Sequence, residues 1–377
     1  MNSKKYNNIK LILGITEAIL TFIVLFLFVS TGLSYSLVEI IEKLVSGKYL
    51  ILIAFTAAVG VAFSIIFAPF GFYTGYYLEH KYKLSNQSFN KWLLEKLKGF
   101  AVSSVIGLPV LIIFYFLLNE FGNLWWLPFA VVLFLVSVIL ARLVPVLILP
   151  IFYRITPVSD EDLKFRIKSI SEEAGLKVEN VYQFDMSKKT KKANALFTGL
   201  GKTKRIILGD TLLDNFTPEQ IETVIAHEAG HYKHKHILKN IIIGTVSSFV
   251  TLFVISLLYK ISLQWFGFSS ITEIAALPLL ILWIMLVTLI QTPLSNILSR
   301  KFEYEADHYA VAVTGKADTF VSALEKLNEQ NLGDADPHPF IEWFFYSHPS
   351  IKNRIKSIMK SGASGYSGFS DFAAGKV

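Results

Sequence analysis

Residues 50–74 read LILIAFTAAVGVAFSIIFAPFGFYT and contain no charged side chain. A helix needs about 20 apolar residues to cross a hydrocarbon core of about 30 Å, so this stretch predicts a transmembrane helix. Further apolar runs of similar length lie at 11–33, 99–118, 125–150, 237–259 and 272–296. We therefore expect about six membrane spans and a mainly α-helical, polytopic membrane protein.

The composition of the whole chain agrees with this expectation. Of the 377 residues, 53% are hydrophobic and only 17% are charged, whereas soluble domains carry about a quarter charged residues. The chain contains no cysteine, which excludes disulfides, a thiolate nucleophile and a cysteine-bound metal. The net charge of +7 is typical of Lys and Arg that flank membrane spans, so no nucleic-acid partner is expected.

The distribution of positive charge predicts the orientation in the membrane. The first apolar run is too long for a signal peptide and lacks a cleavage site, so we expect it to stay as a span. Lysines gather before this run and in the loop between spans two and three (Lys4, Lys5, Lys10, Lys81, Lys83, Lys91, Lys96, Lys98). The positive-inside rule then predicts that both termini and the polar portion 151–236 lie in the cytoplasm. We expect the protein to be integral to the inner (cell) membrane.

Polarity also predicts how the chain is divided. Residues 1–150 form spans one to four, with a basic cytoplasmic loop at 79–98, and residues 237–298 form spans five and six. The polar portions are 151–236 and 299–361, and the Gly/Ser-rich stretch 362–377 is expected to be a disordered tail.

The first polar portion predicts a small α+β domain. Residues 160–174 have the apolar spacing of an amphipathic helix. The segments 178–184, 195–200 and 205–208 are rich in β-formers, with Gly201-Lys202 as a turn. Thr217-Pro218-Glu219-Gln220 is a capping box that opens a second helix. That helix should reach about Lys235, and the pattern leaves open whether it continues into span five.

This second helix carries an H-E-x-x-H motif, in which His227 and His231 flank Glu228. Histidines four residues apart share one helical face, so both can bind one metal ion while Glu228 handles the attacking water. The alternative is a pair of exposed histidines beside a solvated glutamate. His234 and His236 lie in a basic run at the membrane boundary and are expected to be interfacial rather than metal ligands.

A catalytic zinc site takes three protein ligands, so a third must come from elsewhere. The best candidates are Glu303 and Asp307, which follow the sixth span and share a helical face. One would bind the metal and the other would orient a histidine ring; periodicity does not choose between them. Glu305 is expected to be a charged surface residue.

These motifs resemble those of a known family. Ala193-Asn194-Ala195-Leu196-Phe197, the H-E-A-G-H motif, the stretch from Ser299 to Asp307 and Ser347-His348-Pro349 are similar in kind and order to those of the type 1 CAAX prenyl proteases. These are integral-membrane zinc peptidases of the gluzincin class. The resemblance implies a helical barrel around a chamber, with a small zinc-peptidase domain on its cytoplasmic side.

The same resemblance implies a role for each site residue. His227, His231 and Glu303 would bind one zinc ion per chain, and Glu228 would be the general base. Asp307 and Arg354 would support the ligands, His348 would contact the substrate or the developing oxyanion, and Asn194 and Ala195 would pair with the substrate backbone. The partners would be the lipid bilayer and a peptide or protein substrate, lipidated or membrane-associated substrates included.

Two features separate this chain from the eukaryotic members. They usually have seven spans, and this chain has six predicted spans and no cysteine, which is typical of a prokaryotic member. The resemblance therefore implies zinc endopeptidase chemistry, in membrane-protein processing or quality control as readily as in prenylated-protein cleavage. The alternative function is a transporter or channel, suggested by six spans with Glu17 and Arg142 inside apolar runs.

Overall fold

The computed structural model describes residues 2–176, 178, 180–198 and 205–363. The predicted Gly201-Lys202 turn and all but the first two residues of the predicted tail lie outside the described residues. The chain forms two compact units. The first, here called the membrane unit, contains Asn8–Ala141 and Asn240–Gln291; the second, the site unit, contains Met1–Asn7, Arg142–Lys239 and Thr292–Val377.

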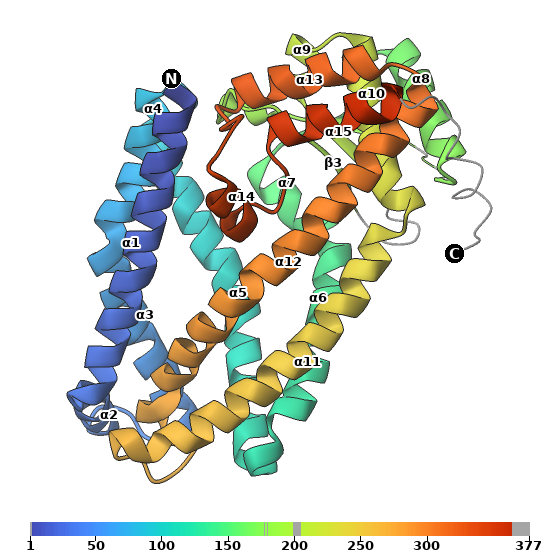
Figure 1. The fold of residues 1–377 in the computed structure, drawn as a ribbon. Coiled ribbons are helices and arrows are strands. Elements are labelled where there is room, and N and C mark those ends of the chain that lie inside the picture. The colour runs from blue at the N-terminus through green and yellow to red at the C-terminus, as the bar shows by residue number, and fades with distance from the viewer. Residues whose placement is uncertain (1, 177, 179, 199–204, 364–377) are drawn as a thin grey trace. The chain divides into compact units, whose positions relative to one another are not determined.

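Six helices in the described residues are long and apolar enough to cross a membrane, as predicted. They extend over Asn2–Ser30, Lys48–Lys81, Phe89–Leu124, Trp126–Phe152, His236–Phe266 and Ile274–Thr314. The main helices within them are α1 (Asn2–Ser30), α3 (Lys48–Phe72), α5 (Phe89–Phe121), α6 (Trp126–Leu143), α11 (His236–Ser262) and α12 (Leu277–Thr314) (Figure 1). The shorter α2 (Leu33–Glu42), α4 (Leu78–Lys81) and α7 (Leu149–Phe152) lie at or near their ends.

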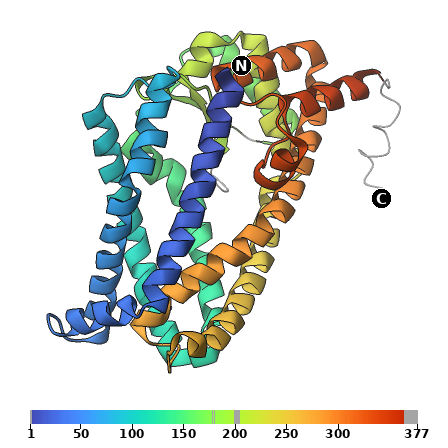
Figure 2. The same ribbon diagram turned by 60° about the vertical axis from the view of Figure 1, so that its left-hand side comes forward.

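The membrane unit has many exposed apolar side chains. Side chains such as Ile65 and Val105 are largely exposed, as is expected of helices that face lipid. Inside the unit, α11 and α12 are neighbours joined by a short connection (Figures 1 and 2). Their contact includes a hydrogen bond of 2.9 Å from the Trp283 indole to the Ser262 hydroxyl.

The site unit contains a four-stranded sheet in the order β1-β2-β4-β3. Its strands are β1 (Ile155–Pro157), β2 (Val181–Phe184), β3 (Ala195–Thr198) and β4 (Arg205–Gly209). β2 and β4 are parallel, and the other two pairs are antiparallel. The three predicted strands are present, β2 in a shorter form, whereas β1 was not predicted. Within the described residues, β3 pairs only with β4 and is an edge strand.

Six further helices of the described residues belong to the site unit, and one of them, α10, carries the motif. They are α8 (Glu161–Glu173), α9 (Asp210–Asn215), α10 (Pro218–Lys233), α13 (Ala317–Gln330), α14 (Pro339–Phe345) and α15 (Ile351–Ala363). The predicted capping box of α10 is present, with Thr217 and Gln220 exchanging side chain–backbone bonds. Ile221 and Ile225 of α10 pack with residues of the sheet and α8, and Ala226 and Ala229 belong to a separate cluster with α12, α13 and α15. α10 is therefore fixed on two sides.

α10 does not continue straight into α11. It ends at Lys233, and Lys235 adopts a left-handed backbone conformation with φ of 56° before α11 begins at His236. Residues other than glycine, asparagine and aspartate rarely adopt this conformation. The break changes the direction of the chain four residues after the second motif histidine.

Candidate metal centre

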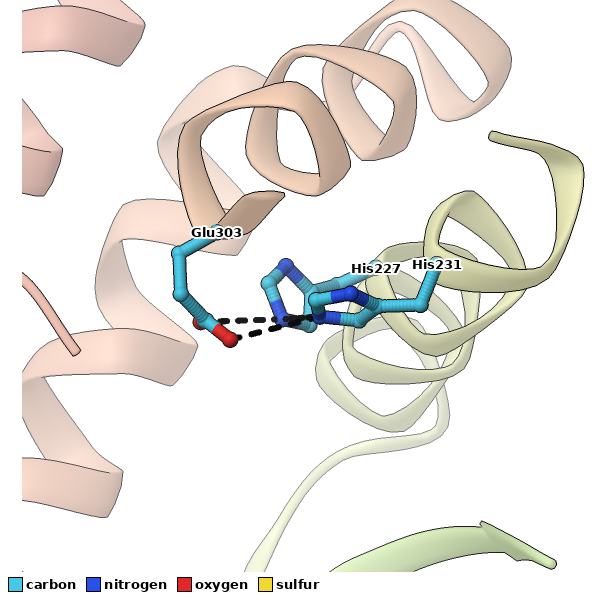
Figure 3. Close-up of side chains that lie close together, drawn as sticks. All are labelled: His227, His231 and Glu303. Carbon is cyan, nitrogen blue, oxygen red and sulfur yellow. Dashed lines mark hydrogen bonds and ion pairs between the residues drawn. The ribbon is translucent and has the colours of Figure 1, made fainter. Parts of the chain in front are cut away.

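Three side chains of the site unit point at one position (Figure 3). His227 and His231 come from α10 and Glu303 from α12, and their nearest ligand atoms form a compact triangle. The two Nε2 atoms are 3.2 Å apart, and they lie 3.5 and 3.3 Å from the Glu303 carboxylate oxygens. Ligands about 2.0–2.1 Å from a tetrahedral zinc ion are separated by about 3.3 Å, so the triangle has the size that zinc requires.

The residues also fit a metal ion chemically. Glu303 is buried, and its Oε2 atom has no hydrogen-bond partner among the described residues. A buried carboxylate oxygen normally has a partner, because an unsatisfied polar atom in the interior costs about 1–3 kcal/mol. Two imidazole nitrogens and one carboxylate are the donor set of many catalytic zinc sites.

Glu303 and Asp307 contact different atoms of His227. Glu303 faces Nε2, on the side of the triangle, whereas Asp307 lies 2.9 Å from Nδ1 on the opposite edge of the ring. Asp307 also receives a 2.9 Å hydrogen bond from Arg354 Nε, and both side chains are buried. Burial alone would lower the pKa of His227, but the nearby carboxylates of Asp307 and Glu303 favour its protonated form, outweigh burial and raise that pKa to about 9.

His231 has a different neighbour on its outer edge. Its Nδ1 lies 2.9 Å from Nδ1 of His236, and His236 Nε2 lies 2.9 Å from a carboxylate oxygen of Glu305. His236 is buried and stacks on the Phe302 ring at 4.1 Å between centroids. His236 is thus not one of the three converging ligands, as expected, but it is buried and contacts one of them; Glu305, expected to be a charged surface residue, is partly exposed and contacts His236.

A glycine lets the two ligand-bearing helices meet. A Cβ atom placed on Gly230 of α10 would lie 3.0 Å from the Cα of Ala306 and 3.1 Å from its carbonyl oxygen. These atoms belong to the backbone of α12 between Glu303 and Asp307, so they cannot rotate away. The absent side chain at position 230 thus brings α12 close enough for both carboxylates to reach His227.

Glu228 borders a cavity of about 400 Å³ beside the triangle. The cavity is also lined by His227, Glu303, His348 and Asn194. Burial raises the pKa of the Glu228 carboxyl, and the two neighbouring motif histidines oppose this rise. A carboxylate at the edge of such a cavity can accept a proton from a molecule bound there.

His348 lies on the loop between α14 and α15, which other residues hold in place. Its Nε2 is 3.4 Å from Glu303 Oε1, and its side chain is 66% exposed. Arg300 of α12 donates hydrogen bonds to the carbonyls of Glu342 and Tyr346, and Glu342 accepts the Ser350 N–H. Arg300 and Glu342 were not predicted as functional residues; Arg300 stands inside the 299–307 motif, which was the available signal.

The edge strand presents its backbone to the same cavity. Gly209 of β4 donates its N–H to the Asn194 carbonyl, so Asn194 faces β4. In an antiparallel ladder neighbouring residues alternate in direction, so the N–H and C=O of Ala195 face the open edge. Ala193 points the same way, and the Asn331 side chain occupies both its N–H and its C=O. Ala195 is therefore the first residue of this edge whose N–H and C=O are open to a partner. The role of Asn331 could not be predicted, because it is far from Ala193 in the sequence.

Comparisons with known proteins agree with this site. Residues 157–361 match the model of peptidase family M48, and residues 1–154 match the CAAX prenyl protease N-terminal model of five membrane helices. An uncharacterized metalloprotease of Bacillus subtilis (strain 168), YhfN, is 29% identical over 369 residues, with 95% of this chain and 85% of the relative covered. CAAX prenyl protease 1 of Saccharomyces cerevisiae is 29% identical over 315 residues, covering 78% and 69%.

A solved structure extends the likeness to the fold. The crystal structure of S. mikatae Ste24p matches with a TM-score of 0.84 and 26% identity, covering 95% of this chain and 88% of that one. A transporter or channel is not favoured by any of these matches. The chain belongs to peptidase family M48 and is a multi-pass membrane metalloprotease of the CAAX prenyl protease kind.

Proposed function

We propose that this protein is a zinc-dependent endopeptidase that holds one zinc ion through His227, His231 and Glu303. The observation that carries the proposal is the convergence of two Nε2 atoms and a buried, unsatisfied carboxylate at spacings of 3.2–3.5 Å. When bound, zinc lowers the pKa of a coordinated water towards neutral and polarises a carbonyl group.

The protein's own residues then act on the substrate. Glu228, at the edge of the cavity, accepts the proton of the attacking water and returns it to the leaving amine. His348 is exposed to the same cavity and can donate a hydrogen bond to the oxygen that becomes negative in the transition state. Asp307 and Arg354 keep His227 oriented so that its Nε2 faces the metal.

The substrate would add a strand to the edge of the sheet. The open N–H and C=O of Ala195 can pair with an extended peptide, and such backbone bonds tolerate varied side chains. Asn331 blocks the preceding open position, Ala193, so the paired stretch should end there. This geometry favours a peptide or a flexible protein segment as the substrate.

The distribution of positive charge supports a location for the site, and the names of relatives support a class of substrate. Positive charge before the first span and in the loop 79–98 supports a site on the cytoplasmic side of the inner membrane. Substrates would be lipidated or otherwise membrane-associated proteins, because several relatives are named CAAX prenyl protease 1. With no native cysteine, Cys introduced at the exposed Ser159 should resist an impermeant thiol reagent in intact cells, whereas Cys at Ser46 should react.

Replacing the proposed base tests the reaction. Glu228→Gln should abolish peptide hydrolysis and leave about one zinc per chain, because all three ligands remain. Glu303→Ala should instead lower zinc content as well as activity. Near-normal turnover by Glu228→Gln would refute the assignment of the base, and full zinc content in Glu303→Ala would refute the ligand set.

A second experiment tests the edge strand. Ala195→Pro removes the N–H that faces the open edge, so it should raise KM or lower kcat while zinc content stays unchanged. Ala195→Gly keeps the N–H and serves as the matched control. Parent-like cleavage by Ala195→Pro would remove the edge from the mechanism. Asn194→Pro is less informative, because the Asn194 backbone faces β4.

A further inference from the structure

His236 and Glu305 lie outside the proposed ligand set, yet they form a continuous chain of contacts with it. The chain joins Glu305 to His236 Nε2 at 2.9 Å and His236 Nδ1 to His231 Nδ1 at 2.9 Å. The other ring nitrogen of His231, Nε2, points at the metal position. The chain is thus aligned with the ligand atom that would bind zinc.

Hydrogen-bond chemistry permits one arrangement of protons along this chain. A metal-bound Nε2 of His231 uses its lone pair on the metal, so its Nδ1 carries the hydrogen and donates it to His236. His236 accepts at Nδ1 and therefore carries its own hydrogen on Nε2, which it donates to the Glu305 carboxylate. Every donor meets an acceptor, and His231 is fixed in the tautomer that binds metal through Nε2.

The fold explains how His236 reaches this position. In a continuous helix, residues five apart lie about 140° apart around the axis, so His231 and His236 would face different directions. The left-handed Lys235 interrupts the helix and lets α11 begin with His236 beside His231. Stacking on Phe302 then holds the His236 ring in its plane.

We propose that His236 and Glu305 are positioning residues for zinc: they orient His231 and strengthen its binding through Nε2. This inference rests on the proposed metal site and extends it. Partners of this kind contribute about 10- to 100-fold to metal affinity. His236 should carry more of this effect than Glu305, because it contacts the ligand directly and is buried, whereas the Glu305 side chain is 30% exposed.

The test measures the zinc dissociation constant of the detergent-purified full chain by competition with a chelator. His236→Phe keeps an aromatic ring to stack on Phe302 but removes the acceptor, and should weaken zinc binding about 10- to 100-fold. His236→Asn keeps an acceptor close to the position of Nδ1 and should restore much of the affinity. His234→Ala is the matched control, since His234 stacks against His236 without entering the chain of contacts, and should bind zinc like the parent.

Substitution of Glu305 provides a second test, which leaves the His236 ring unchanged. Glu305→Gln should weaken zinc binding less than His236→Phe, and should add nothing in the His236→Phe background, because the two residues act in one chain. Parent-like affinity in His236→Phe would overturn the proposal, and so would independent effects in the double variant. If His236→Phe fails to fold, parent-like affinity in Glu305→Gln together with equal loss in His236→Asn and His236→Ala overturns it. A parent protein that binds no zinc would instead refute the proposed function.

Discussion

The two histidines of the motif are four residues apart on one helix, yet different surroundings support them. His227 contacts Asp307, whose side chain is fully buried and is paired with the buried Arg354. His231 contacts His236, which leads to the partly exposed Glu305 and two lysines at its surface. The residues that support His227 thus form a buried ion pair, whereas those that support His231 form a series of hydrogen-bonded side chains that ends near solvent.

This difference in burial predicts a difference in consequence. A buried ion pair that loses one partner leaves an uncompensated charge in the interior, which is strongly destabilising. A series of contacts that ends at a partly exposed carboxylate loses mainly the orientation of His231 when it is broken, because water can replace the missing partner at the outer end. Substitutions around His227 should therefore lower both the stability of the fold and zinc binding, whereas substitutions around His231 should mainly lower zinc binding.

Asp307→Asn should produce the largest effect. The Arg354 guanidinium would lose its buried counterion and be left with Glu303, 3.8 Å away, which would draw that carboxylate from the metal. We expect a loss of about 3–5 kcal/mol in stability and a fall in zinc content. The thermal unfolding midpoint in detergent and metal analysis of the purified protein measure the two effects.

The chain offers a matched control for this substitution. Asp162 pairs with Arg166 Nε at 2.8 Å, almost the same distance as in the buried pair, but its side chain is 69% exposed. Asp162→Asn should leave the unfolding midpoint and zinc content unchanged, since solvent replaces an exposed partner. Equal effects of the two substitutions would show that burial does not separate them.

Gly230→Ala should have the next largest effect and act on both supports. The added methyl group would press on the Ala306 backbone at 3.0 Å and separate α10 from the turn of α12 that carries Glu303, Glu305 and Asp307. Overpacking of this kind costs about 1–3 kcal/mol, and zinc content should fall. Gly244→Ala is the control, because a Cβ at this helical glycine meets no atom within 4 Å. Full zinc content in Gly230→Ala would contradict the close-approach argument.

Local geometry explains which parts of the site the sequence predicted. His227 and His231 meet because a spacing of four is a property of the helix itself, and the capping box marks where that helix begins. The six spans follow equally from local hydropathy. Glu303 and Asp307 could both be proposed, but their roles depend on which edge of His227 each one reaches, and helix packing decides that.

Tertiary structure explains what was missed. His236 joins the site because the left-handed Lys235 ends the helix, and the sequence has no glycine at this position that would have predicted the break. Asn331 occupies the backbone of Ala193 across 138 positions of sequence. The two motif histidines were therefore predictable from short-range pattern, whereas the choice between Glu303 and Asp307 and the residues that orient the histidines required the fold.

The smallest effect should come from the outer end of the His231 support. Lys239 and Lys301 lie 3.8 and 4.0 Å from the Glu305 carboxylate, and their side chains are 46% and 71% exposed. Exposed pairs of this kind contribute little because water and salt screen them. Lys239→Met should therefore change the zinc dissociation constant by less than about twofold, and that difference should vanish at high salt.

The measurement is the same chelator competition, run at low and at high ionic strength with Lys301→Met alongside. The more exposed Lys301 should have the weaker effect of the two. A loss of zinc affinity in Lys239→Met as large as in His236→Phe would mean that the charge of Glu305, rather than its hydrogen bond, orients His236 and His231. The His231 support would then be an electrostatic pair like the one at His227, and the contrast between the two histidines would be one of degree.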